Sequence, residues 1–483
     1  MLRDLKSLGR DTVIYGLSTV VGRLVNVFLL PIYTHYLAPG DYGVASTVFA
    51  YLAFLNVVYA YGMDLAFMRF SGRGKDGETG NFSTPFFSVA ATSILLSAAI
   101  YVFAGPVARL ADVPPGLENV VKLSAWILAL DAIAIVPFAE LRLARRATAY
   151  AGIKTANIIL NVALTYFFLG RLRLGVPGVF LAAMAASSAT LTMLAPVVAK
   201  KLEFKFDRPL HKEMLHFGLP LIPAGIASMV VQVIDRPIMM RMSGDAAVGI
   251  YTANYKLGIF MQLIINMFDM AWRPFILPRA ESPDVKRLIA RVLTYFCAGS
   301  AVVVIAVSLF IRDVVALPLL GGKPLIHPDY WSGLPVVPWV LLAYFFNGVY
   351  YNFLTPVNLA KRNDLVAVAT ALGAIVNVAA ILILLPRWGI VGAAAATLLA
   401  YVVMACVLYF LAQKVYPVDY EWARLTRVAA AFSASGALAW YFWDSPLWSR
   451  GLIVLTIPVI LAASGFVAED ERAALRRRLA RSA

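Results

Sequence analysis

Cysteine and charged residues are both scarce in this chain of 483 residues. The two cysteines, Cys297 and Cys406, each lie inside an apolar stretch, which argues against a disulfide framework. Only 14% of the residues are charged, whereas soluble domains carry about 25%. Hydrophobic residues make up 61% of the chain, and the mean hydropathy is +0.77. A soluble protein could not bury this much apolar surface, so lipid must be the solvent for most of the chain.

Histidine is rare as well, and the sequence offers no metal-ligand spacing. The four histidines are His35, His211, His216 and His327. None is spaced with a carboxylate or cysteine as a ligand set, so we expect no metal or other cofactor. The glycines of Gly40-Asp-Tyr-Gly43 and Gly321-Gly322 indicate turns, since neither follows a strand as a phosphate loop does. No segment between apolar runs is long enough for a soluble catalytic domain, so we do not expect an enzyme.

Long apolar runs dominate what remains. A bilayer core of about 30 Å requires about 20 apolar residues per helix. Runs of this kind occur at 11–37, 44–68, 84–106, 120–141, 150–170, 176–198, 214–241, 246–273, 288–311, 334–355, 364–386, 389–412, 424–443 and 447–467. The sequence therefore predicts an all-α polytopic membrane protein with about 14 transmembrane helices. The first run has no clear cleavage site, so we interpret it as a retained helix.

Lysine and arginine are distributed unevenly across the predicted loops. If the N-terminus is cytoplasmic, the inner segments hold 30 of the 42 and the outer segments hold eight. This bias predicts that both termini are cytoplasmic. It also accounts for the net charge of +15 without nucleic acid as a partner. The basic tail 469–483 and the segment 1–10 are predicted to lie on the anionic inner leaflet.

The chain contains an internal repeat. At an offset of 206, Pro31-Ile32 aligns with Pro237-Ile238, and Gly43-Val44 aligns with Gly249-Ile250. At an offset of about 215, Asn161-Val162 aligns with Asn377-Val378. Six helices per repeat make the repeats parallel, related by an axis along the membrane normal, with a cavity expected between them. The predicted divisions are an interfacial segment 1–10, a six-helix bundle 11–200, a cytoplasmic linker 201–213, a second six-helix bundle 214–415, two additional helices 416–468 and the tail 469–483.

Several segments resemble those of one family of transporters. They are Leu30-Pro-Ile-Tyr-Thr-His-Tyr-Leu-Ala-Pro-Gly-Asp-Tyr-Gly43, Tyr61-Gly-Met-Asp-Leu-Ala-Phe-Met-Arg-Phe70, Ile234-Asp-Arg-Pro237, Val248-Gly-Ile-Tyr-Thr-Ala-Asn-Tyr-Lys256 and Leu385-Pro-Arg-Trp-Gly-Ile-Val-Gly-Ala-Ala394. They are similar to segments of Wzx-type oligosaccharide flippases, in the multidrug/oligosaccharidyl-lipid/polysaccharide (MOP) exporter superfamily. The resemblance implies a MATE-like fold in the bacterial inner membrane. It also implies an undecaprenyl-pyrophosphate-linked oligosaccharide as substrate, for polysaccharide such as lipopolysaccharide O-antigen. Proton or sodium coupling, and contact with polysaccharide polymerase machinery, are further possibilities.

A flippase for a lipid pyrophosphate requires cationic groups within the membrane. Arg23, Arg236 and Lys256 lie inside predicted helices one, seven and eight and are the candidate substrate-binding residues. The alternatives are that Arg23 pairs with a carboxylate for packing and that Arg236 extends to the outer surface. Asp235 is adjacent to Arg236 and is a candidate counter-ion.

Acid–base pairs recur at the inner ends of helices two and eight. Asp64 and Arg69 end the former, and Asp269 and Arg273 end the latter. Their equivalent places predict an inner gate of salt bridges. The alternative is a pair four or five residues apart that stabilises one helix end. Asp131, an isolated acid in helix four, is a candidate protonation site, unless it simply reaches water.

Two other functions remain open. A multidrug exporter of the same superfamily would share the fold but would require acidic groups at its centre, whereas the deep charges here are mostly basic. A membrane glycan polymerase or ligase would require acids, or arginine and histidine, in sizeable outer loops. Only 312–333 is long, and His327 and Asp329 give it little catalytic support. A structural scaffold would not require charge within the membrane.

Overall fold

The computed structural model describes residues 28–71, 82–320, 322–443 and 445–467, and these are almost entirely helical. Residues 28–36 form a helix. The further helices are α2 (Pro39–Ala60), α3 (Met63–Phe70), α4 (Ser83–Val102), α5 (Ala104–Leu110), α6 (Glu118–Leu143), α7 (Ala147–Tyr166), η2 (Phe167–Arg171), α8 (Gly175–Lys201), α9 (Arg208–Gly218), α10 (Leu221–Val233), α11 (Asp235–Ser243), α12 (Asp245–Leu257), α13 (Ile259–Ile276), η3 (Leu277–Arg279), α14 (Val285–Ala316), η4 (Pro328–Gly333), α15 (Val336–Leu359), α16 (Asp364–Val415), α17 (Trp422–Tyr441) and α18 (Leu447–Ala463). Eight helical segments in these ranges are long and apolar enough to cross a membrane. The expected all-α polytopic class is confirmed.

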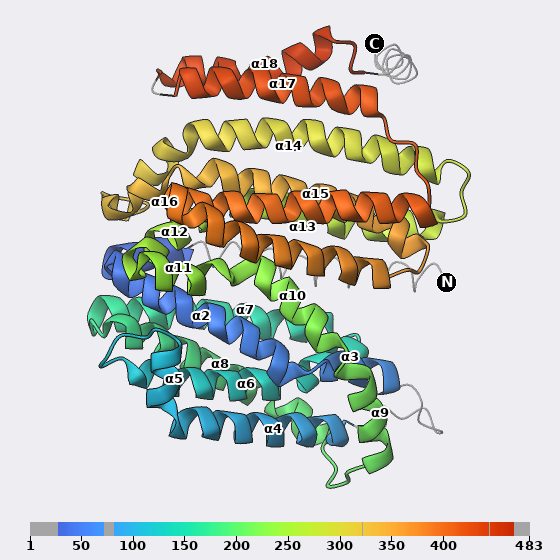
Figure 1. Ribbon diagram of the computed structural model, residues 1–483. Helices are drawn as coiled ribbons and strands as arrows, with labels where there is room; N and C mark the ends of the chain where they lie inside the picture. The colour runs from blue at the N-terminus through green and yellow to red at the C-terminus, as the bar shows by residue number, and fades with distance from the viewer. Residues whose placement is uncertain (1–27, 72–81, 321, 444, 468–483) are drawn as a thin grey trace.

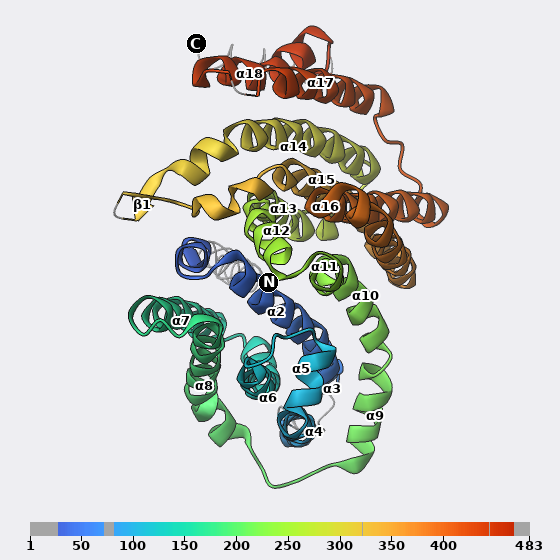
Figure 2. The same cartoon turned by 60° about the vertical axis from the view of Figure 1, so that its left-hand side comes forward.

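The helices form two groups that lie side by side with their axes roughly aligned. Figure 1 shows α2 to α8 in one group and α12 to α16 in the other, with α17 and α18 beyond α14. Figure 2 shows α9 and α10 running along one side and linking the groups. The two groups meet mainly where α2 packs against α12. The end at which α3 and α9 lie is the predicted cytoplasmic end and is called the inner end below.

Several of the expected membrane spans are broken helices. The run 214–241, expected as one helix, is divided among α9, α10 and α11, with breaks at 219–220 and at Ile234. Pro220 contributes to the first break because proline lacks a backbone donor and crowds the preceding turn. The run 246–273 breaks at Gly258 between α12 and α13. Gly389, with a φ of 57°, separates the two halves of α16, which were expected as two helices.

A short segment between α14 and α15 covers the outer end of the contact between the groups. Strands β1 (Pro318–Leu320) and β2 (Lys323–Pro324) pair antiparallel, and η4 follows. The Tyr330 hydroxyl donates to the carbonyl of Leu37 at 2.9 Å, and Asn254 Nδ2 donates to the Tyr330 carbonyl at 2.8 Å. Burial raises the pKa of the Tyr330 phenol, which keeps it a neutral donor. Tyr330 therefore joins both groups of helices at their outer end.

The last two helices are attached to α14 by arginines. Arg450 of α18 forms an ion pair with Asp313 at 2.7 Å near the outer end. Arg424 of α17 pairs with Glu421 at 2.8 Å and donates to the Tyr295 hydroxyl of α14 at 3.1 Å. Burial of charged groups is costly unless they are paired, so these contacts fix where α17 and α18 sit.

Candidate functional site

A cavity of about 830 Å³ opens between the second group of helices and the helices α10 and α11 that lead into it. It is lined by Ala224, Ser228, Val231, Gln232, Val233, Arg236, Tyr255, Lys256, Ile259, Gln262, Asn266, Tyr344, Asn347, Tyr350, Tyr351, Leu354, Asn358, Asn363, Val366, Ala367, Thr370, Tyr401 and Met404. These residues belong to α10 to α13, α15, α16 and the turn before α16. We expected a cavity between the two bundles. Among the described residues, its walls come from the second group together with α10 and α11, and none comes from α2 to α8.

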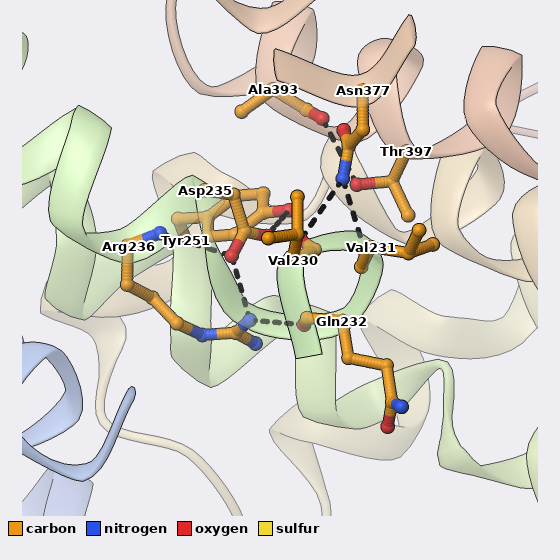
Figure 3. Close-up of polar contacts among 9 residues, drawn as sticks. All are labelled: Val230, Val231, Gln232, Asp235, Arg236, Tyr251, Asn377, Ala393 and Thr397. Carbon is orange, nitrogen blue, oxygen red and sulfur yellow. Dashed lines mark hydrogen bonds and ion pairs between the residues drawn. The ribbon is translucent and has the colours of Figure 1, made fainter. Parts of the chain in front are cut away.

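Arg236 lies at the break between α10 and α11 and is held by neighbouring groups. Its Nη1 donates to Asp235 Oδ1 at 2.7 Å and to the Gln232 carbonyl at 2.8 Å. Asp235 Oδ2 accepts from the Tyr251 hydroxyl at 2.6 Å (Figure 3). Arg236 is 7% exposed and Asp235 2%. Both carboxylate oxygens are thus occupied by protein donors, and Asp235 is the direct counter-ion of Arg236.

Part of the Arg236 guanidinium remains available to the cavity. Its Cζ atom lies 4.7 Å from the centroid of the Tyr255 ring, and this contact stabilises the cation and fixes its orientation. In the structure as described, Nε and Nη2 make no hydrogen bond to the protein. An arginine offers five donors in a planar fork, so Arg236 can still bind a phosphate oxygen from its free edge.

Lys256 is the second cation in the wall. It lies 11 residues from the start of α12, about 17 Å along the helix axis. Its Nζ lies 5.3 Å from the ring centroids of both Tyr33 and Tyr42. Among the described residues it has no carboxylate within ion-pair distance. A lysine at this depth without a counter-ion is costly, and an anionic ligand would offset that cost.

The remaining polar lining is neutral. No aspartate or glutamate is among the described lining residues, which instead include amides, hydroxyls and five tyrosines. Asn347 is only 8% exposed, and its side chain makes no hydrogen bond to a described residue. Asn266 of α13 also lines the cavity, and its Nδ2 is buried without a partner among the described residues. The sequence interpretation missed both amides, although polar residues within apolar runs were a signal that could have found them.

A further polar cluster lies behind Arg236. Asn377 of α16 donates from Nδ2 to the carbonyl of Val231 at 3.1 Å, and Thr397 donates to the Ala393 carbonyl at 3.3 Å (Figure 3). The Asn377 bond satisfies a carbonyl freed at the end of α10. The Asn377 bond therefore joins α10, the helix before the break at Arg236, to α16.

The other predicted site residues are spread over the molecule. Arg23 lies outside the described residues, as does the side chain of Arg273. Asp64 forms an ion pair with Arg142 of α6 at 3.5 Å. The Arg69 guanidinium lies 4.5 Å from the ring centroid of Phe217 in α9. Asp64 therefore pairs within its own group of helices, so the gate joining it to Asp269 and Arg273 stays a prediction.

Asp131 is found inside the first group, away from the cavity. Its Oδ1 accepts a hydrogen bond from Ser187 of α8 at 2.7 Å. Within the ranges that the structure covers, no three His, Cys, Asp or Glu residues are grouped to hold a metal.

Several solved structures with the same fold are described as transporters or flippases. The lipid II flippase MurJ in an inward closed conformation matches with a TM-score of 0.74 at 12% identity, covering 93% of this chain and 98% of that one. An inward-facing multidrug resistance MATE family transporter of the MOP superfamily matches with a TM-score of 0.65 at 15% identity, covering 82% and 97%. The MATE multidrug transporter DinF-BH matches with a TM-score of 0.60 at 16% identity, covering 85% and 95%. Among curated proteins, none matches the sequence.

These likenesses show that the chain has the MATE-like fold of an all-α polytopic membrane protein, as expected. The model of one family, described as polysaccharide biosynthesis protein, matches residues 34–322, more than half of the chain. The chain belongs to this family. The family model thereby confirms the resemblance at the level of a polysaccharide biosynthesis family.

Proposed function

We propose that this protein is a flippase that moves undecaprenyl-pyrophosphate-linked oligosaccharide across the bacterial inner membrane by alternating access. The glycan would serve cell-surface polysaccharide, such as lipopolysaccharide O-antigen, and both termini would be cytoplasmic. The observation that carries the proposal is the charge of the cavity. Its described lining contains Arg236 and Lys256 and no carboxylate.

The two cations suit a pyrophosphate for different reasons. Arg236 presents the free edge of a fork, which matches two phosphate oxygens, while Lys256 is a compact charge. Bringing a pyrophosphate into a low-dielectric site costs several kcal/mol per charge, and nearby fixed cations offset that cost. Arg23 would add a third cation if helix one lines the same cavity.

The structure as described also supports alternating access. The outer end is closed by α2 against α12 and by Tyr330, while the cavity lining extends to Asn358 and Asn363 at the inner end of α15 and α16. A lipid-linked substrate made on the cytoplasmic side would enter from that end. Loading from the inner leaflet would then precede opening at the outer end.

The rival functions require different groups. A multidrug exporter for cationic drugs would need an acidic cavity, and the likeness to MATE structures is one of fold alone. A glycan polymerase or ligase would need reactive groups in the outer segment. There, His327 lies 3.3 Å from Asp329, and both are exposed.

The test is glycan export in a strain lacking its own flippase. Lys256→Ala and Arg236→Gln should each reduce export at least tenfold, and Lys256→Arg should retain more export than Lys256→Ala. Lys122→Ala is the matched control, because Lys122 also lies over a tyrosine ring, at 5.4 Å from Tyr101, but outside the cavity. Membrane expression is quantified for every variant. Normal export by a well-expressed Arg236→Gln, Lys256→Ala double variant would refute the cationic cavity.

A further inference from the structure

The polar groups of the cavity are not evenly distributed. The cations lie at one end, where Arg236 stacks on Tyr255 and the Tyr255 ring meets that of Tyr344 at 6.0 Å between centroids. From Tyr344, the lining residues of α15 continue for 14 residues to Asn358, about 21 Å along the helix. This second part, between Tyr344 and the inner end, carries no charge among its described lining residues.

Neutral amides with unused hydrogen-bonding capacity concentrate in this second part. Asn347 is 8% exposed, lines the cavity and makes no side-chain hydrogen bond to a described residue. Asn266 lines the cavity from α13, and its Nδ2 is buried without a partner among the described residues. Leaving the buried Asn266 Nδ2 without a hydrogen bond costs about 1–3 kcal/mol, so this group points to a ligand that supplies the missing bond.

Asn358 and Asn363 add two exposed amides where the cavity reaches the inner end. Tyrosines lie between them and the cations. The Tyr350 hydroxyl lies 3.3 Å from Thr370 Oγ1, and Tyr351 also faces the cavity. Flat rings together with amides that both donate and accept form a surface that suits a ring of carbon atoms carrying hydroxyl groups.

We propose that the surface formed by Asn266, Asn347, Tyr351, Asn358 and Asn363 binds the neutral, polyhydroxylated sugar attached directly to the pyrophosphate. This inference rests on the proposed function, because Arg236 and Lys256 fix the pyrophosphate at the other end. The substrate then lies with its pyrophosphate deep in the cavity and its glycan toward the inner end. A volume of about 830 Å³ is of the size that holds one drug-sized ligand, so further sugars extend through the inner opening.

This orientation of the substrate places the groups that select the glycan apart from those that bind the pyrophosphate. Any lipid pyrophosphate satisfies the cations, so the cations alone do not select a glycan. The amides contact only the first sugar, and each lost hydrogen bond would weaken its binding roughly threefold to tenfold. Selection for the first sugar therefore resides in α13, α15 and α16.

The test compares two probes on the purified full-length protein. One is farnesyl diphosphate, and the other is the same lipid diphosphate carrying one N-acetylglucosamine. Variants are Asn347→Leu, which is nearly isosteric, and the exposed pair Asn358→Ala with Asn363→Ala. The control is Asn119→Ala, an exposed amide at the outer start of α6.

We expect the parent protein to bind the glycosylated probe at least tenfold more tightly. The amide variants should lose most of this advantage and leave farnesyl diphosphate binding unchanged. Equal weakening of both probes, or no weakening of the glycosylated one, would overturn the sugar surface. Failure of the proposed function would give another result. Arg236→Gln and Lys256→Ala would then bind farnesyl diphosphate as tightly as the parent protein does, whatever the amide variants do.

Discussion

Gly43 of α2 and Gly249 of α12 lie against each other with no room for a side chain between them. A Cβ on Gly43 would overlap the Asp245 carbonyl oxygen, and a Cβ on Gly249 would overlap the Pro39 carbonyl oxygen. Gly43 and Gly249 are equivalent in the repeat, and so are Pro39 and Asp245. The two contacts are therefore related by the repeat, as contacts at a two-fold axis are.

We expect Gly43→Ala and Gly249→Ala to disturb the outer closure. The added carbon meets backbone, which cannot move aside as a side chain can, so overpacking should cost about 1–3 kcal/mol. The thermal unfolding temperature and glycan export should both fall. Gly152→Ala on α7 is the control, since a Cβ there meets nothing within 4 Å. Unfolding temperatures equal to that of the control would mean that the contact is looser than described.

Asp235 should stabilise the protein through Arg236. In Asp235→Asn the buried guanidinium loses its counter-ion, at a cost of about 3 kcal/mol, and the double variant with Arg236→Gln should recover part of it. Thermal unfolding in detergent measures the cycle. Asp313→Asn is the comparison. Asp313 pairs with Arg450 at the same distance of 2.7 Å but is 40% exposed, so this substitution should cost about 1 kcal/mol of stability or less. Additive effects at Asp235 and Arg236 would contradict the coupling.

The inner gate remains a prediction, and the Asp64–Arg142 ion pair identifies the partner that Asp64 would have to leave. We expect Asp64 to exchange Arg142 for Arg273 when the inner end closes. Double-mutant cycles on export, with Asp64→Asn against Arg142→Gln and against Arg273→Gln, measure both couplings. Coupling to Arg142 alone would assign Asp64 to packing within the first group.

Membrane spans and deep cations were accessible from the sequence because both follow from the cost of exposing polar groups to lipid. The apolar runs fall on helices throughout the described residues, although several runs are divided by breaks, and Arg236 and Lys256 both line the cavity. The local sequence does not indicate which side chains of two distant helices come into contact in the bundle. The Asp64–Arg142 pair joins residues 78 positions apart, and Tyr330 bonds to Leu37 across 293. The placement of the cavity in one half likewise depends on how broken helices pack, which periodicity does not specify.

Asp131 offers the last test, because it lies in the half from which no described residue lines the cavity. Its carboxylate is held by Ser187 at 2.7 Å, and an ionisable group at this depth is a candidate for proton coupling. Asp131→Asn keeps the shape and an oxygen that accepts from Ser187, but it cannot exchange a proton. We therefore expect unchanged farnesyl diphosphate binding. In proteoliposomes, the acceleration of transport by an imposed pH gradient should be lost. Asp131→Glu should retain part of that response. Asp112→Asn is the control, since Asp112 pairs with the exposed Arg241 outside the bundle core. If Asp131→Asn responds to the gradient as the parent protein does, then Asp131 serves only to pack α6 against α8, and any coupling must use another group.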